Sequence, residues 1–138
     1  MQVKDVMNPD PVVLKREDPV IRAIRVFLDS GVSLIPILDD EDNFIGIVTM
    51  KDILWSFLPL LEEESNEEGS ILNHYPTIYL IDDVMEWDAS TIQEDDDLIS
   101  SIGKMEAENL VCITVLRGQR VVGILNNINL FRAIFSKK

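Results

Sequence analysis

The sequence predicts an α/β fold built from two copies of one unit, each a small sheet packed on two helices. The first reason is an internal repeat: at an offset of 78 residues, Val6-Met7 aligns with Val84-Met85 and Asp18-Pro19 with Asp96-Asp97. The second reason is that short apolar runs alternate with segments whose apolar residues recur at helical spacing. Two such units would bury their open sheet faces together, which gives a pseudo-twofold module with equivalent clefts between the copies.

The first helix of each copy is predicted by an apolar stripe at positions i, i+4 and i+7. The stripe consists of Val20, Ile24 and Phe27 in the first copy and of Leu98, Ile102 and Met105 in the second. We expect Asp18 to cap the first helix with Pro19 at its first position, and either Asp96 or Asp97 to cap the second. Gly31 and Asn109 would end the two helices, because both residue types readily adopt the left-handed conformation.

A strand, a hairpin, a second strand and a second helix follow in each copy. The predicted segments are 34–38, 39–43, 46–48 and 50–58 in the first copy and 112–116, 117–120, 123–125 and 127–135 in the second. Pro59 should end the helix of the first copy at Leu58. The chain therefore divides into repeat 1 over residues 1–59, an acidic linker over 60–80 and repeat 2 over 81–138.

Composition excludes several functional classes. The net charge of −13 and the pI near 4.3 oppose binding to nucleic acid or to anionic membrane surfaces. One cysteine, Cys112, permits no internal disulfide, and no Cys/His cluster could hold zinc. The sequence shows neither a signal peptide nor an apolar run long enough to cross a bilayer, so we expect a soluble, cytoplasmic protein.

The most informative stretch runs from Gly46 to Asp52, where a strand leads into a helix. Gly46 has no side chain, so a flat ligand could lie against the backbone there. Thr49 and Asp52 would present a hydroxyl, a carboxylate and free N–H groups that suit the hydroxyls and phosphate of a nucleotide. The same Thr-x-x-Asp pair is also an ordinary capping box, and the motif alone favours capping.

Three segments follow one another in the first copy, and the whole set recurs in the second copy. Together they resemble a tandem pair of CBS (cystathionine-β-synthase) domains, which is called a Bateman module. They are Val3-Lys4-Asp5-Val6-Met7 with Pro11-Val12-Val13, then Gly31 to Asp39, then Gly46 to Leu54. The resemblance covers nearly the whole chain outside the acidic linker. It implies a non-catalytic sensor that binds an adenine nucleotide or related adenosyl ligand and regulates a partner enzyme, channel or transporter. No cofactor is implied beyond this ligand.

The resemblance also implies which residues bind the ligand. Asp52 would accept hydrogen bonds from the ribose hydroxyls, and Thr49 would bond toward the ribose or phosphate. The first cleft would comprise Ile47, Thr49, Asp52, Ser90, Thr91, Ile92, Leu110 and Val111. A second, weaker cleft would comprise Val12, Val13, Val32, Ser33, Ile124, Asn126 and Asn129.

The second cleft departs from the family pattern, because Asn126 and Asn129 replace the Thr and the Asp. An amide lacks the charge that strengthens a ribose hydrogen bond, a difference of about 1 kcal/mol. The resemblance implies that firm phosphate binding uses Arg or His near the strand starts, and none stands there, so AMP or an adenosine-like ligand is favoured over ATP.

Other readings remain open. A Cys112/His74 dyad is a poor catalytic set, because a cysteine inside an apolar strand is usually inert, so we expect no enzymatic activity. Calcium binding by the acidic linker lacks the spacing of an EF-hand. The main alternative is a ligand-free module that forms a structural homodimer, with Trp55 and Phe57 either on the dimer face or in the core.

Overall fold

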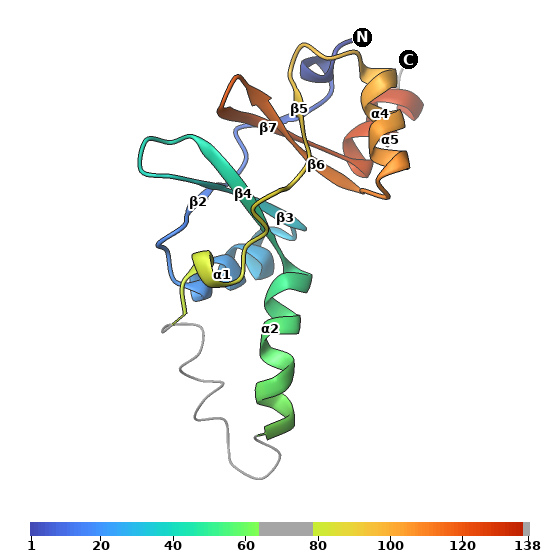
Figure 1. Ribbon diagram of the computed structural model, residues 1–138. Coiled ribbons are helices and arrows are strands. Elements are labelled where there is room, and N and C mark those ends of the chain that lie inside the picture. Colours follow the sequence, from blue (N-terminus) through green and yellow to red (C-terminus); the bar gives the residue numbers. More distant parts are fainter. Residues whose placement is uncertain (64–78, 137–138) are drawn as a thin grey trace. The chain divides into compact units, whose positions relative to one another are not determined.

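The computed structural model describes residues 1–63 and 79–136, and its chain falls into two compact units (Figure 1). Unit 1 consists of Met1–Pro11 together with Ser90–Lys138, and unit 2 consists of Val12–Ala89. The boundaries between the units therefore lie near residues 11 and 89, whereas the boundary between the two sequence repeats lies at the linker. Each unit packs a short N-terminal segment from the other sequence copy onto its own sheet.

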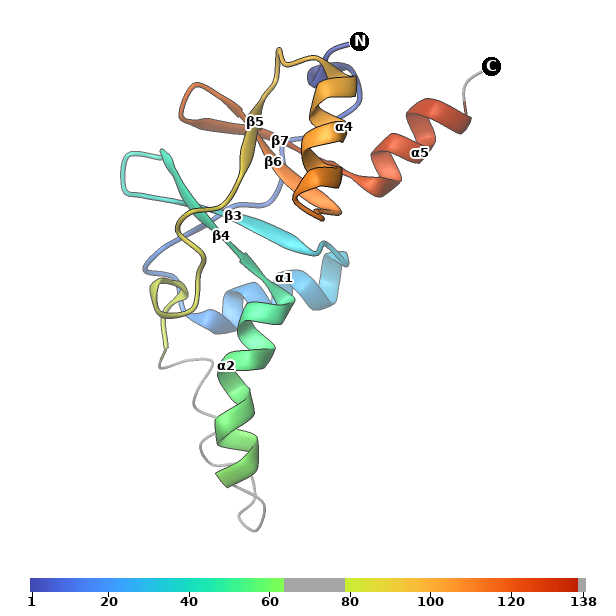
Figure 2. The same ribbon diagram turned by 45° about the vertical axis from the view of Figure 1, so that its right-hand side comes forward.

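Unit 2 contains a three-stranded sheet in the order β2-β3-β4, formed by Leu14–Lys15, Leu34–Leu38 and Phe44–Thr49. β2 runs parallel to β3 and β4 antiparallel to it. Helix α1 (Val20–Ser30) connects the first two strands, which is the crossover that parallel pairing requires. Helix α2 (Met50–Glu63) continues outward from β4 (Figure 2), and a 3₁₀ turn, Ile81–Asp83, follows the linker.

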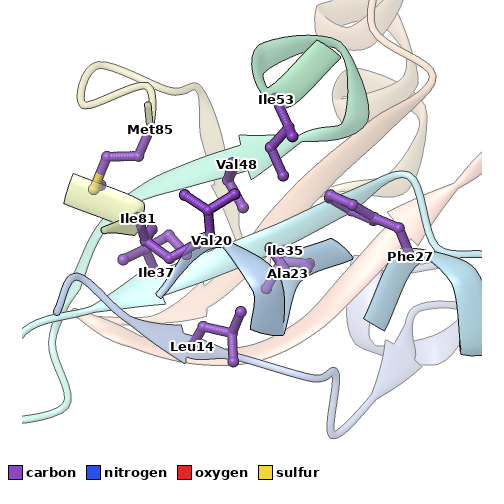
Figure 3. Packing of buried hydrophobic residues seen from close by; sticks show 10 residues of the cluster. All are labelled: Leu14, Val20, Ala23, Phe27, Ile35, Ile37, Val48, Ile53, Ile81 and Met85. Carbon is purple, nitrogen blue, oxygen red and sulfur yellow. The ribbon is translucent and has the colours of Figure 1, made fainter. Parts of the chain in front are cut away.

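The core of unit 2 lies between this sheet and α1 (Figure 3). All five residues of β3 are buried, as the uninterrupted apolar run predicts. Side chains from the 3₁₀ turn complete the core. The buried cluster comprises Leu14, Val20, Ala23, Phe27, Ile35, Ile37, Val48, Ile53, Ile81 and Met85.

Unit 1 contains a four-stranded sheet in the order β1-β7-β6-β5, formed by Asn8–Pro9, Arg120–Asn126, Cys112–Arg117 and Thr91–Gln93. A 3₁₀ turn, Val3–Asp5, precedes β1, and the helices are α4 (Leu98–Ala107) and α5 (Asn127–Phe135). The buried cluster comprises Val3, Ile92, Leu98, Met105, Ile113, Val115 and Leu125. The mixed α/β class and the two small sheets with their helices confirm the fold predicted from the sequence.

The helix starts were predicted correctly in one copy only. Asp97 caps α4, because its carboxylate accepts the Ser100 N–H at 3.0 Å. The prediction that Asp18 caps α1 was wrong: the N-cap is Pro19, and the Asp18 carboxylate instead accepts the Lys15 N–H at 2.8 Å. The turn before the helix competes successfully for this side chain.

The predictions for the helix ends and the hairpins agree better with the structure. Gly31 and Asn109 both have positive φ, at 70° and 56°, as predicted for residues that close helices. The hairpin tips adopt positive φ at Asp42 and Gly118. The exception is Pro59, which lies inside α2 rather than ending it. A proline removes one N–H from a helix but does not always stop it.

Most of the predicted linker, residues 64–78, lies outside the described part of the chain, while residues 60–63 form the end of α2. Any role of His74, and calcium binding by most of the acidic stretch, concern residues outside the described part. Across residues 1–63 and 79–136, no helix combines the length and apolarity that a membrane span requires.

Candidate functional site

The helix mouth of unit 2, which is the start of α2 at Thr49 and Asp52, forms a reciprocal capping box. The Thr49 N–H donates to Asp52 Oδ2 at 2.9 Å, and the Asp52 N–H donates to Thr49 Oγ1 at 3.2 Å. Both residues are half-buried, at the junction of β4 and α2. The capping interpretation of the motif is therefore confirmed. It leaves the negative charge of Asp52 at the N-terminus of a helix, where the helix dipole favours it.

The space above Gly46 is filled by the chain itself. A Cβ at this position would lie 2.2 Å from the Glu86 carbonyl oxygen and 2.5 Å from Met85 Cε. Ile47 and Glu86 exchange two backbone hydrogen bonds, of 2.9 and 2.8 Å. The expectation that a ligand lies against the backbone at Gly46 was wrong, because the 85–86 segment occupies that place.

This segment brings a second carboxyl group to the helix mouth. Glu86 is hydrogen-bonded through its side chain to Asp52. Partial burial, this hydrogen bond and the negative charge of Asp52 together raise the pKa of Glu86, and only Lys51 opposes the shift. Sequence reasoning missed Glu86. The one available signal was its place in the repeat, where Met85-Glu86 aligns with Met7-Asn8.

Unit 1 repeats this geometry with amides in place of carboxyls. The Asn126 N–H donates to Asn129 Oδ1 at 3.1 Å, and the Asn129 N–H donates to Asn126 Oδ1 at 2.9 Å. In β1, Asn8 pairs with Ile124, as Glu86 pairs with Ile47 in unit 2. The same backbone arrangement therefore forms without any carboxylate.

The other residues predicted for the first cleft lie mostly in unit 1. The Ser90 hydroxyl donates to the Glu108 carboxylate. Thr91 and Ile92 belong to β5 and pair with Thr114 and Val115 of β6. Val111 is 60% exposed. Leu110, half-buried, packs against the core of unit 1, and Ile47 is buried in β4.

The residues predicted for the second cleft also come from both units. Val12 is 46% exposed, Val13 is half-buried and Ile124 is buried. Val32 packs against the core of unit 2, and Ser33 beside it is exposed. Each predicted cleft draws on both units, and the structure describes its two halves separately. The two clefts remain predictions.

The described residues offer little support for catalysis or metal binding. Cys112 is buried at the start of β6. Within residues 1–63 and 79–136, no three side chains of His, Cys, Asp or Glu come together in a way that could hold a metal ion.

The first part of the chain matches a known protein family in sequence. Residues 3–58 match the model of the CBS domain family. The chain is 42% identical over 53 residues to an inosine-5'-monophosphate dehydrogenase of Methanocaldococcus jannaschii. The aligned region covers 38% of this chain and 11% of that protein. It is also 37% identical over 51 residues to protein MK0525 of Methanopyrus kandleri. That aligned region covers 37% of this chain and 26% of that protein. The chain thus spans a small part of the length of these relatives.

Solved structures match over almost the full length. CBSX2 in complex with AMP gives a TM-score of 0.78 at 21% identity, covering 98% of this chain and 96% of that one. The CBS domain pair of protein MJ0100, in complex with 5'-methylthioadenosine and S-adenosyl-L-methionine, gives 0.77 at 23% identity, covering 100% and 98%. At this level of identity the likeness establishes the fold of both halves.

Proposed function

Because the chain is a tandem pair of CBS domains in fold, with the first domain also matched in sequence, we propose that it binds an adenosyl ligand and acts as a regulatory module. AMP or an adenosine-like compound is the favoured ligand. The binding site would be the first predicted cleft, with Asp52 accepting the ribose hydroxyls. The complexes of similar domain pairs with AMP and with S-adenosyl-L-methionine support this class of ligand.

The observation that carries the proposal is the carboxylate of Asp52. Asn129 makes the same two-way capping contact in unit 1 without a charge, so capping does not require an acid. A carboxylate offers two acceptor oxygens and forms stronger hydrogen bonds to hydroxyl groups than an amide does. The acid at residue 52 is therefore not needed for the capping contact, and it is suited to a ribose.

The test is a thermal-shift series on the ligand-free protein with AMP, ADP, ATP, adenosine, S-adenosylmethionine and GMP. At 100 times its Kd, a ligand that binds only the folded state stabilises it by about 2.7 kcal/mol, a rise in Tm of several degrees. We expect this rise with AMP or adenosine and none with GMP.

Asp52→Asn is the decisive variant, because it gives the helix mouth of unit 2 the amide that Asn129 supplies in unit 1. The ligand-induced rise in Tm should disappear, while the Tm without ligand changes by a degree or two. Asn129→Asp is the matched control and should leave the rise in place. An unchanged rise in Asp52→Asn would contradict the assignment of this residue to the ribose.

A second function rests on a separate observation, the exposed apolar side chains of two helices. The exposed residues are Met50, Leu54, Trp55 and Leu58 in α2, and Ile128, Phe131, Ile134 and Phe135 in α5. Phe57, by contrast, packs against the core of unit 2, so only Trp55 of that pair suits an interface. These faces support a homodimer, through which the module would regulate an effector enzyme or transporter in the cytoplasm.

The two functions make different predictions. A ligand-free dimerisation module would show no thermal shift with any adenosyl compound, yet would sediment as a dimer. A ligand-binding module would show the shift whatever its oligomeric state. Sedimentation velocity with and without AMP, alongside the thermal series, separates the two.

A further inference from the structure

Basic side chains gather at one pocket of unit 2, which is lined by residues of β2, of α1 and of the segments beside them. The pocket has a volume of about 440 Å³ and a floor formed by Val13, Leu14 and Val26. Its rim carries Lys15, Arg22 and Arg25, with Asp18 as the acidic group. The whole chain has 12 Lys and Arg against 25 Asp and Glu, so three cations around one pocket run against the overall charge.

Two of these cations are held in place by carboxylates. Arg22 Nη1 lies 2.9 Å from Asp18 Oδ1, while the other Asp18 oxygen accepts the Lys15 N–H. The Lys15 ammonium donates to the Asp39 carbonyl at 3.0 Å and pairs with the Asp42 carboxylate. The acidic groups therefore fix the positions of Lys15 and Arg22 at the rim.

Arg25 differs from its two neighbours. Among residues 1–63 and 79–136, no carboxylate forms an ion pair with it. It lies three residues after Arg22 on α1, so the two guanidinium groups project from the same face of the helix. Like charges at this spacing destabilise a helix slightly, and an anion between them would reverse that effect.

The equivalent place in unit 1 shows that the cations are not required for folding. Arg22 and Arg25 align with Ser100 and Gly103 of α4. The turn before the helix nevertheless forms in the same way, because Asp96 accepts the Gln93 N–H at 2.9 Å as Asp18 accepts that of Lys15. The two arginines are thus additions specific to unit 2.

We propose that this pocket binds a phosphate group, with Arg25 and Arg22 as its guanidinium donors. The planar fork of a guanidinium matches two phosphate oxygens at once, and two forks on one helix face suit a dianion. The apolar floor would accept an organic group attached to the phosphate. This site goes beyond the proposed adenosyl cleft, with which it shares no residue; Val13 belongs to the second, weaker predicted cleft. The phosphate could be free or part of a nucleotide.

The test is NMR of the full chain, following the arginine side-chain N–H signals and the backbone amides of residues 13–26. Inorganic phosphate, AMP and adenosine are titrated separately, with sodium chloride at matched ionic strength as the screening control. We expect saturable shifts at Arg22 and Arg25 with phosphate and none with chloride. Shifts with AMP but not adenosine would identify a nucleotide as a source of the phosphate.

Arg25→Gln should weaken phosphate binding by about tenfold, since one charge-assisted contact is lost. Arg132→Gln removes the same charge from the exposed face of α5 and should leave the affinity unchanged. Equal shifts with chloride and phosphate, or an Arg25→Gln variant that binds phosphate as tightly as the parent, would overturn the proposal. The Asp52→Asn variant should still bind phosphate here, so this site and the adenosyl cleft can fail independently.

Discussion

The helix mouths of the two units are built alike and charged differently. Both follow a strand that contains a buried glycine, Gly46 or Gly123, and both are closed by a reciprocal capping box. Unit 2 places Asp52 and Glu86 there, where unit 1 places Asn129 and Asn8. Capping and strand pairing thus account for the shared backbone, whereas they do not account for the two acids. The difference separates what the fold needs from what a ligand would need.

Glycine substitution is expected to give the largest difference between the two mouths. Gly46→Ala should cost about 3 kcal/mol of unfolding free energy, because its Cβ would meet the Glu86 backbone oxygen at 2.2 Å. Gly123→Ala should cost about 1 kcal/mol, since its nearest neighbour, Met7 Sδ at 2.5 Å, belongs to a flexible side chain. Urea unfolding of both variants measures the difference. Equal losses would show that the two approaches are equally rigid.

The middle strands offer a second contrast, at Pro36 in β3 and its counterpart Thr114 in β6. Thr114 is fully buried, and among the described residues its hydroxyl has no hydrogen-bond partner. Thr114→Val should therefore raise the unfolding free energy by about 1 kcal/mol, because it removes an unsatisfied buried hydroxyl.

Thr49→Val is the matched control for this substitution, because the Thr49 hydroxyl accepts the Asp52 N–H. It should lower stability by about 1 kcal/mol. Chemical denaturation of both variants reports the signs. A loss of stability in Thr114→Val would mean that its hydroxyl has a bound partner such as water.

The smallest effect concerns pH. The raised pKa of Glu86 means that the folded protein holds this proton more tightly than the unfolded chain does. Its contribution to stability is therefore present at low pH and is lost as the pH rises through the folded-state pKa. Glu86→Gln should be more stable than the parent at pH 7, by less than about 1 kcal/mol because the site is largely exposed, and equal to it near pH 4.

Asn8→Glu supplies the comparison in unit 1, where the neighbouring capping residue is an uncharged amide. Without an adjacent carboxylate, the new acid should not lower stability between pH 4 and pH 7. Thermal melts across this range test both variants. A pH effect of the same size in Asn8→Glu would assign it to the overall negative charge instead of the Asp52 contact.

Most features set by neighbours in sequence were predicted correctly; the exceptions are the cap at Asp18 and the helix end at Pro59. Apolar spacing located the helices and strands, and the Thr49/Asp52 box was recognisable because its members are three residues apart. The repeat in the sequence also predicts Gly31 and Asn109 as equivalent helix ends, and both have positive φ. These signals are local, so a single sequence contains them.

Features that depend on distant segments were missed. Nothing near Gly46 in the sequence indicates that Glu86 pairs with Ile47 and fills the space above the glycine. Asp18, by contrast, was assigned to the wrong contact for a local reason, because the turn that begins at Lys15 and the helix cap attract the same side chain.

The way the two units divide the chain has a consequence for its biosynthesis. Unit 2 is one continuous segment, Val12–Ala89, so it can fold as soon as that segment has left the ribosome. Unit 1 needs Val3, which is fully buried in its core, together with strands beyond residue 90. Residues 1–11 must therefore wait for the segment beyond residue 90, and closing that long loop makes unit 1 the slower of the two to form.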